Sequence, residues 1–191
     1  WLQCLSLAVL AYHVDRAVTV RQAFVQAWWF ALAWLLGATW WLFVSLHTYG
    51  GLAAPLAALA ILLFSAGLAL IYGTGAAACR ALCASHASRA VRVVAFAAMW
   101  TAAELVRGNL WTGFPWGAGG YAHIDSLLHH WAPWFGVYGL TAISAALAMW
   151  LGAQRQTQRQ VKSPSRASMP TLALTSLALV ALTYTWVQSP T

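Results

Sequence analysis

Two charged residues inside an apolar stretch are the strongest candidates for chemistry in this sequence. Glu104 and Arg107 are three positions apart, so both side chains fall on one face of a helix. Either charge alone is costly inside a bilayer, although together the two can share charge. The planar donor fork of arginine also suits phosphate. The pair therefore predicts either a site for a lipid phosphate, carboxylate or headgroup, or a structural pair that holds this helix to its neighbours.

A loop rich in glycine and aromatic residues follows Arg107. From Gly108 to Tyr121 it reads GNLWTGFPWGAGGY. Proline removes a backbone donor and glycine loosens the chain, so the helix is predicted to end here. The residues between stay apolar, which favours a re-entrant or interfacial segment packed against protein; a plain outer loop with a membrane-dipping turn is the alternative. The residues predicted to line a path for an acyl chain are Trp111, Phe114, Pro115, Trp116 and Tyr121.

Other polar residues and the cysteines are weaker candidates. The residue types allow acid–base or metal chemistry, but a role as polar side chains at the membrane interface is the better interpretation. These residues are His123, Asp125, His129 and His130. The three cysteines are Cys4, Cys79 and Cys83, and they lack the spacing of a metal site. No nucleophile elbow, phosphate-binding loop or zinc-binding helix motif occurs in the sequence. We therefore expect no catalytic residue, metal or cofactor in this chain.

The composition indicates that these residues belong to a membrane protein. The chain has 191 residues, of which 62% are hydrophobic and 7% charged, and its mean hydropathy is +0.69. Soluble domains carry about 25% charged residues. Because the deficit runs along the whole chain, we predict an all-α, polytopic transmembrane helix bundle with a broken aromatic loop. The net charge of +7 comes from basic residues in short loops, which set topology rather than bind nucleic acid.

Six hydrophobic segments are predicted within a single membrane domain over residues 1–191, the first of them partial. They span about Trp1–Tyr12, Gln22–Leu46, Pro55–Tyr72, Val93–Arg107, Pro133–Leu151 and Thr171–Val187. Loops that carry arginine or lysine alternate with loops that do not. The positive-inside rule therefore places the first, third and fifth loops in the cytoplasm. The turn at Ser45–Gly51, the aromatic loop and the C-terminus are then predicted to face outward.

The order of these motifs resembles the apolipoprotein N-acyltransferase family. The turn at Ser45–Gly51 resembles the one after that family's third helix, and the match covers most of the chain in order. The residues that carry the resemblance are Glu104 and Arg107, Gly113-Phe114-Pro115-Trp116, Gly120-Tyr121, Ile124-Asp125, Ala132-Pro133 and Gly136-Val137.

The resemblance implies a multi-pass enzyme of the bacterial inner membrane with a periplasmic, nitrilase-like domain that carries a Glu-Lys-Cys triad. It implies that an acyl chain passes from a phospholipid to the triad cysteine, and then to the amino group of the diacylglyceryl-cysteine of an apolipoprotein. The triad has no counterpart in this sequence. We therefore expect the parent protein to continue into that domain and the fragment alone to be inactive. This part would anchor the catalytic domain and shape a lateral path for lipid.

Two other functions remain open from the residues. A small membrane transporter or channel subunit also uses broken helices and buried charges, although it would be expected to show internal pseudo-symmetry, and the sequence has no internal repeat. A structural membrane scaffold for a soluble partner is the third reading. It predicts that the outer loops tolerate substitution as long as the partner still docks.

Overall fold

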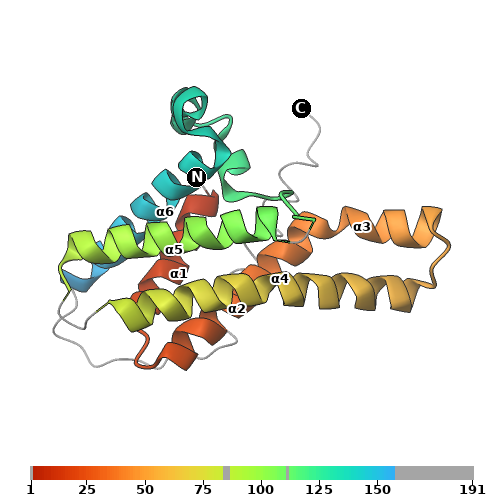
Figure 1. The fold of residues 1–191 in the computed structure, drawn as a ribbon, viewed down its shortest axis with the longest axis horizontal. Helices are drawn as coiled ribbons and strands as arrows, with labels where there is room; N and C mark the ends of the chain where they lie inside the picture. The colour runs from red at the N-terminus through yellow and green to blue at the C-terminus, as the bar shows by residue number, and fades with distance from the viewer. Residues whose placement is uncertain (1, 84–86, 111, 158–191) are drawn as a thin grey trace.

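The chain folds as an all-α bundle (Figure 1). A computed structural model describes residues 2–83, 87–110 and 112–157, with side chains as far as Ala153. These ranges contain helices and no strand. The α-helices are α1 (Leu2–Asp15), α2 (Val20–Thr39), α3 (Trp41–Phe43), α4 (Ala54–Leu82), α5 (Arg89–Asn109) and α6 (Ala132–Thr157). A π-helical turn, η1 (Val44–Tyr49), and two 3₁₀ turns, η2 (Gly119–His123) and η3 (Leu127–Trp131), complete the fold.

Local signals fix where the helices begin. The Thr19 hydroxyl accepts a hydrogen bond from the Gln22 N–H at 3.1 Å, while the Gln22 side chain accepts one from the Val18 N–H at 3.0 Å. This arrangement resembles a capping box and supplies partners to free backbone donors. Ser88 caps α5 through the Val91 N–H, and a proline occupies the first turn of α4.

Helices α2, α4 and α5 contribute the rings of an aromatic core. Helix α2 packs along α4, α5 lies against α4 and α6, and α6 also contacts α1. The Trp100 ring of α5 is at the centre, with its centroid 4.8 Å from that of Tyr72 and 6.1 Å from that of Trp34. Offset and tilted contacts of this kind stabilise a core beyond the area that they bury. This core lies directly beneath the end of α5 that carries the charged residues.

Two helical stretches in the described residues are long and apolar enough to cross a membrane, Ala54–Leu82 and Leu127–Ala153. A third is possible if α2 and the bent stretch Trp41–Tyr49, which are inclined by 52°, form one span. Helix α1 is apolar but shorter than these stretches. The prediction of about six spans stays a prediction, because Thr171–Val187 lies outside the described residues.

Three predicted boundaries differ from the structure. The segment Gln22–Leu46 is not one helix, because α2 ends at Thr39 and the chain bends before the π-helical turn. Helix α4 continues to Leu82, ten residues beyond the predicted end. Gly73 does not stop this helix because it lies against the Phe24 ring of α2, where an added Cβ would be 2.9 Å from the nearest ring atom. Helix α5 begins at Arg89 and is therefore longer than the predicted segment.

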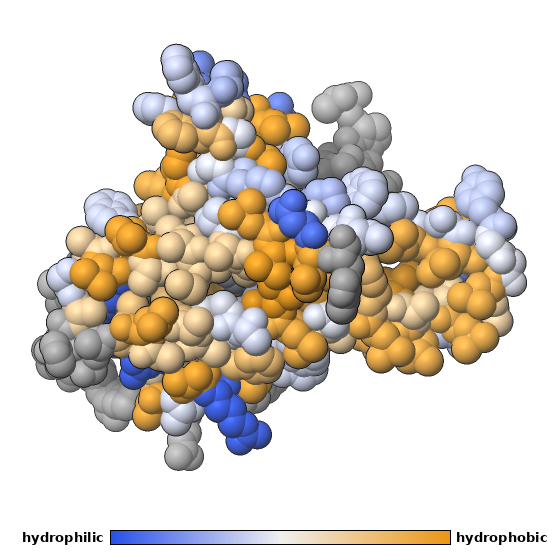
Figure 2. Space-filling view, in the orientation of Figure 1, coloured by the Kyte–Doolittle hydropathy of each residue, from blue (hydrophilic) through white to orange (hydrophobic). Residues whose placement is uncertain are grey.

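Apolar side chains cover the extension formed by α3, η1 and the first half of α4, which projects from the bundle (Figures 1 and 2). Large, contiguous apolar surfaces of this kind are unusual on soluble monomers and suit contact with lipid. The exposed large side chains on the extension include Trp40, Trp41, Val44, Leu56, Leu59, Leu62 and Leu63.

Candidate functional site

Glu104 lies on α5 and is fully buried. Its carboxyl oxygens accept hydrogen bonds from the Gly119 N–H at 3.0 and 3.1 Å. The Thr141 hydroxyl of α6 donates to the same group at 2.9 Å. A buried carboxyl group must find such partners, since leaving it without them costs several kcal/mol (about 1–3 per group). Glu104 therefore connects α5 to the end of the aromatic loop and to α6.

Arg107 lies nearly one turn further along α5 and is 1% exposed. Its Nη1 donates to the carbonyl oxygen of Phe114 at 2.7 Å and to that of Trp116, and its Nε donates to the Tyr72 hydroxyl of α4 at 2.9 Å. In return, the Phe114 N–H donates to the Arg107 carbonyl at 2.8 Å. The guanidinium fork thus supplies the partners that an irregular loop cannot find within itself.

The two charged side chains make their hydrogen bonds to different parts of the loop. Within the described ranges the structure records an ion pair between Asp15 and Arg92 and none between Glu104 and Arg107. The pair was predicted to share charge, and the two groups interact electrostatically, although no contact ion pair joins them in the described residues. The same-face placement was correct, but the backbone of the loop, rather than the other charge, occupies the space around each group.

Thr141 is a polar residue in the apolar helix α6, and its hydroxyl group completes this network. It donates to Glu104 and accepts from the Gly120 N–H at 2.9 Å. We expect Thr141→Val to lower the free energy of unfolding by about 1–3 kcal/mol, because it leaves the buried Gly120 N–H without a partner and removes one hydrogen bond from the buried Glu104 carboxyl group. Thermal unfolding of the protein in detergent measures this loss. Thr141→Ser keeps the hydroxyl group and should lower the free energy of unfolding much less. Equal losses in the two variants would show that contacts of the methyl group dominate.

Two glycines allow the loop to approach its neighbours closely. At Gly113, where φ is +70°, an added Cβ would lie 2.1 Å from the Gly108 carbonyl oxygen. At Gly120 it would lie 2.0 Å from the carbonyl oxygen of Val137 on α6. Only glycine fits such positions, since no real carbon and oxygen approach so closely without a bond.

The aromatic side chains of the loop divide between the interior and the surface. Phe114 is half-buried, and its ring packs edge-to-face on Phe64 of α4, with the centroids 4.9 Å apart. Trp116 is 58% exposed, and its ring centroid lies 6.4 Å from that of Trp41. The loop therefore meets the base of the apolar extension at both rings.

Of the other predicted lining residues, two lie at the surface and one lies outside the described residues. Pro115 and Tyr121 are exposed. Trp111 is outside the described residues. The described members of the predicted set thus fall into two groups, with Glu104 and Arg107 inside the protein and three of the four loop residues at its surface.

The polar residues beyond the loop do not converge on one point. His123 on η2 is 1% exposed, and burial lowers its pKa, which favours the neutral imidazole near pH 7. Asp125 and His129 are exposed, and the His129 and His130 rings lie side by side with centroids 3.9 Å apart. Across the described ranges, no three metal-ligating side chains gather into a possible metal site.

Sequence reasoning missed Tyr72 and Thr141, both of which are fully buried and bind the charged residues. A signal for them was available. Polar side chains within apolar helices usually face the protein interior, where they find polar partners.

These features define the class of protein. It is an all-α helical membrane domain in which two buried charged residues of one helix fix a broken aromatic loop at the end of the bundle. Comparison with known sequences gives the family. The sequence model of the apolipoprotein N-acyltransferase N-terminal domain matches residues 1–150. The chain therefore belongs to the apolipoprotein N-acyltransferase family, as the resemblance of its motifs predicts.

Individual relatives support the same conclusion. The chain is 48% identical over 153 residues to the apolipoprotein N-acyltransferase of Verminephrobacter eiseniae strain EF01-2, across 78% of this chain and 28% of that protein. It is 46% identical over 149 residues to that of Ralstonia nicotianae, with the same two shares. For Pseudomonas putida the identity is 38% over 150 residues, across 76% of this chain and 29% of the relative. The chain thus matches less than a third of each relative's length.

Proposed function

We propose that this chain is the membrane portion of an enzyme that transfers an acyl chain from a phospholipid to the N-terminal diacylglyceryl-cysteine of lipoproteins in the bacterial inner membrane. The family match over residues 1–150 and the name shared by the relatives support this reaction. The catalytic triad would lie in the remainder of the parent protein. The membrane portion would anchor that domain on the outer side and shape the path by which lipid reaches it.

The observation that carries this proposal is the construction of the aromatic loop. Glu104 and Arg107 hold the loop from inside the bundle, while Trp116 and Tyr121 stand at its surface, with Trp116 beside Trp41 at the base of the apolar extension. Fixed aromatic and apolar walls with few polar groups suit an acyl chain. In this proposal Phe114, Pro115, Trp116 and Tyr121, together with Trp111, contact lipid, and the two charged residues position them.

Arg107 also has donor capacity that the loop does not use. Its Nη2 is buried and makes no hydrogen bond among the described residues. An oxygen of a lipid headgroup or of a water molecule could accept from it, which agrees with the preference of guanidinium groups for phosphate and carboxylate oxygens. Arg107 would then serve both the loop and the headgroup end of the lipid path.

Trp116→Ala tests the lipid-contacting role. We expect the rate of acyl transfer by the full-length parent enzyme to fall roughly tenfold, which corresponds to about 1.4 kcal/mol of lost transition-state stabilisation. The unfolding temperature should change little, because the side chain is more than half exposed. The measurement is the initial rate of transfer of a labelled acyl chain from phospholipid to a diacylglyceryl peptide in mixed micelles.

Trp134→Ala is the matched control, since Trp134 is 82% exposed on α6 and lies outside the loop. It should keep the wild-type rate. If Trp116→Ala transfers the acyl chain as fast as Trp134→Ala, the loop does not line the lipid path. A purely structural scaffold predicts that result.

A further inference from the structure

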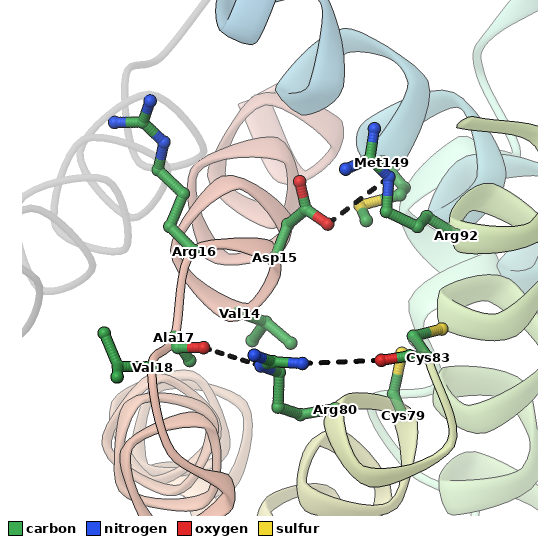
Figure 3. A pocket seen from close by; sticks show the side chains of 10 residues that line it. All are labelled: Val14, Asp15, Arg16, Ala17, Val18, Cys79, Arg80, Cys83, Arg92 and Met149. Carbon is green, nitrogen blue, oxygen red and sulfur yellow. Dashed lines mark hydrogen bonds and ion pairs between the residues drawn. The ribbon is translucent and has the colours of Figure 1, made fainter. Parts of the chain in front are cut away.

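A cavity of about 300 Å³ lies at the other end of the bundle and has no part in the proposed function (Figure 3). It forms where α1 ends and α2 begins, beside the end of α4 and the start of α5. Arg92 at this cavity and Arg107 at the loop are fifteen positions apart on α5, or about 22 Å along the helix axis. A ligand in the cavity would therefore not touch the aromatic loop.

The charge of the lining favours an anion. Arg80, Arg92 and Asp15 line the cavity, so two positive groups face one negative group. Arg16 is also a lining residue, but its guanidinium group points away and donates to the Tyr12 hydroxyl at 2.8 Å. A concave site with an excess of positive charge concentrates anions because its low-dielectric walls focus the field. The volume is at the small end of the range for ligand sites, which suits a phosphate-bearing headgroup rather than an acyl chain.

Arg80 is held in place across the cavity. Its Nε donates to the Ala17 carbonyl oxygen at 2.6 Å, and its Nη1 donates to the Cys83 carbonyl oxygen at 3.4 Å. Figure 3 shows the guanidinium group between these two walls. A guanidinium group that is already fixed loses little conformational freedom when it binds a ligand, so it favours binding more than a mobile surface arginine does.

Arg92 retains donor capacity at the same place. Its Nε lies 3.6 Å from Oδ1 of Asp15, which is too far for a hydrogen bond, and this buried Nε has no hydrogen-bond partner in the described residues. The Asp15 side chain is 6% exposed and that of Arg92 is 22% exposed. A buried donor without a partner costs free energy that an anionic oxygen in the cavity would recover.

We propose that this cavity is a phosphate site, occupied by the headgroup phosphate of an anionic phospholipid or by free phosphate. The positive-inside rule predicts that this end of the bundle faces the cytoplasm, where anionic lipids give the membrane surface its negative potential. Bound phosphate would bridge Arg80 of α4 and Arg92 of α5 and so join the ends of two helices. This inference is independent of the acyl-transfer proposal, since it concerns the opposite end of the bundle.

Protection of Cys83 reports occupancy, because this free, half-buried cysteine lines the cavity. The full-length parent protein in neutral detergent is treated with N-ethylmaleimide, and the alkylation rate of Cys83 is followed by peptide mass spectrometry. Short-chain phosphatidylglycerol is titrated in one arm and inorganic phosphate in the other. Protection by phosphatidylglycerol alone supports a lipid headgroup site, and protection by both supports a site that also takes free phosphate. Protection by neither overturns the proposal.

Arg92→Gln is the decisive variant. We expect it to raise the dissociation constant for the protecting probe roughly tenfold, as for the loss of one charge-assisted hydrogen bond. Arg21→Gln is the matched control, because Arg21 is exposed at the start of α2 and does not line the cavity; it should change the constant less than about twofold. Equal weakening by the two variants would overturn the proposal, since the effect would then come from general charge. The unfolding temperature of each variant verifies that it is folded.

Discussion

Arg107→Ala is expected to lower the free energy of unfolding by about 3 kcal/mol, because it removes the donor from one buried and two partly buried acceptors at once. The Phe114 and Trp116 carbonyl oxygens and the Tyr72 hydroxyl would all lose their partner. The loop between α5 and η2 would then have little to hold it in one conformation. Thermal unfolding of the full-length parent protein, followed by tryptophan fluorescence in detergent, measures the loss.

Arg107→Lys separates charge from geometry. Lysine keeps the positive charge, but its single ammonium group cannot reproduce the planar fork that serves two carbonyl groups and a hydroxyl. We therefore expect most of the stability loss to remain. Arg21→Ala, at an exposed position, should leave the unfolding temperature unchanged. A lysine variant as stable as the wild type would show that the charge alone holds the loop. Because Arg107→Ala is expected to disturb folding, its activity by itself would not identify a contact with lipid.

Gly120→Ala is expected to be the most disruptive small substitution in the loop. Its Cβ would lie 2.0 Å from the Val137 carbonyl oxygen, which belongs to the backbone of α6 and cannot rotate away. The loop or the helix must shift, at an expected loss of about 2–4 kcal/mol in the free energy of unfolding. Gly113→Ala adds backbone strain at φ +70° to a contact of 2.1 Å with the Gly108 carbonyl oxygen, and should lose a similar amount.

Gly67→Ala is the matched control for these two variants. Gly67 lies within α4, and an added Cβ would meet no atom within 4 Å. Alanine favours a helix over glycine by about 1 kcal/mol, so the unfolding temperature should stay the same or rise. Circular dichroism and thermal unfolding of the three variants compare them directly. If Gly120→Ala is as stable as Gly67→Ala, the loop does not pack on α6 in the way described.

The sequence was sufficient to predict the fold class, the two charged residues and the break after them. Helical spacing put Glu104 and Arg107 on one face, and the costs of charge and of proline in an apolar segment required a protein interior and a loop. The same rules could not predict which groups form hydrogen bonds with Glu104 and Arg107. Each partner is a backbone group of the loop or a side chain such as Tyr72, which is 35 positions away from Arg107. No local pattern encodes such a contact.

Two of the misplaced boundaries, those of α2 and α4, share one cause. The prediction ended the apolar segment at Tyr72, but α4 continues through Gly73, where the missing side chain lets α4 pack closely against Phe24 of α2. Conversely, the apolar stretch after Thr39 predicted a continuous helix, although the chain bends there and widens into the π-helical turn. Tertiary packing decides both cases, and hydropathy along the chain does not record it.

The hydrogen-bond partners of α5 also become available in a fixed order while the chain is synthesised. The hydroxyl partner of Arg107 is made 35 residues before it, whereas Glu104 must wait 15 residues for Gly119 and 37 for Thr141. At about 5–20 residues per second, the ribosome needs roughly two to seven seconds to reach Thr141. During that interval α5 carries a carboxyl group that only α6 and its preceding turn can accommodate. The buried carboxyl group of Glu104 therefore gains its full set of partners only after the first half of α6 has been made, so α5 is expected to complete its packing together with α6.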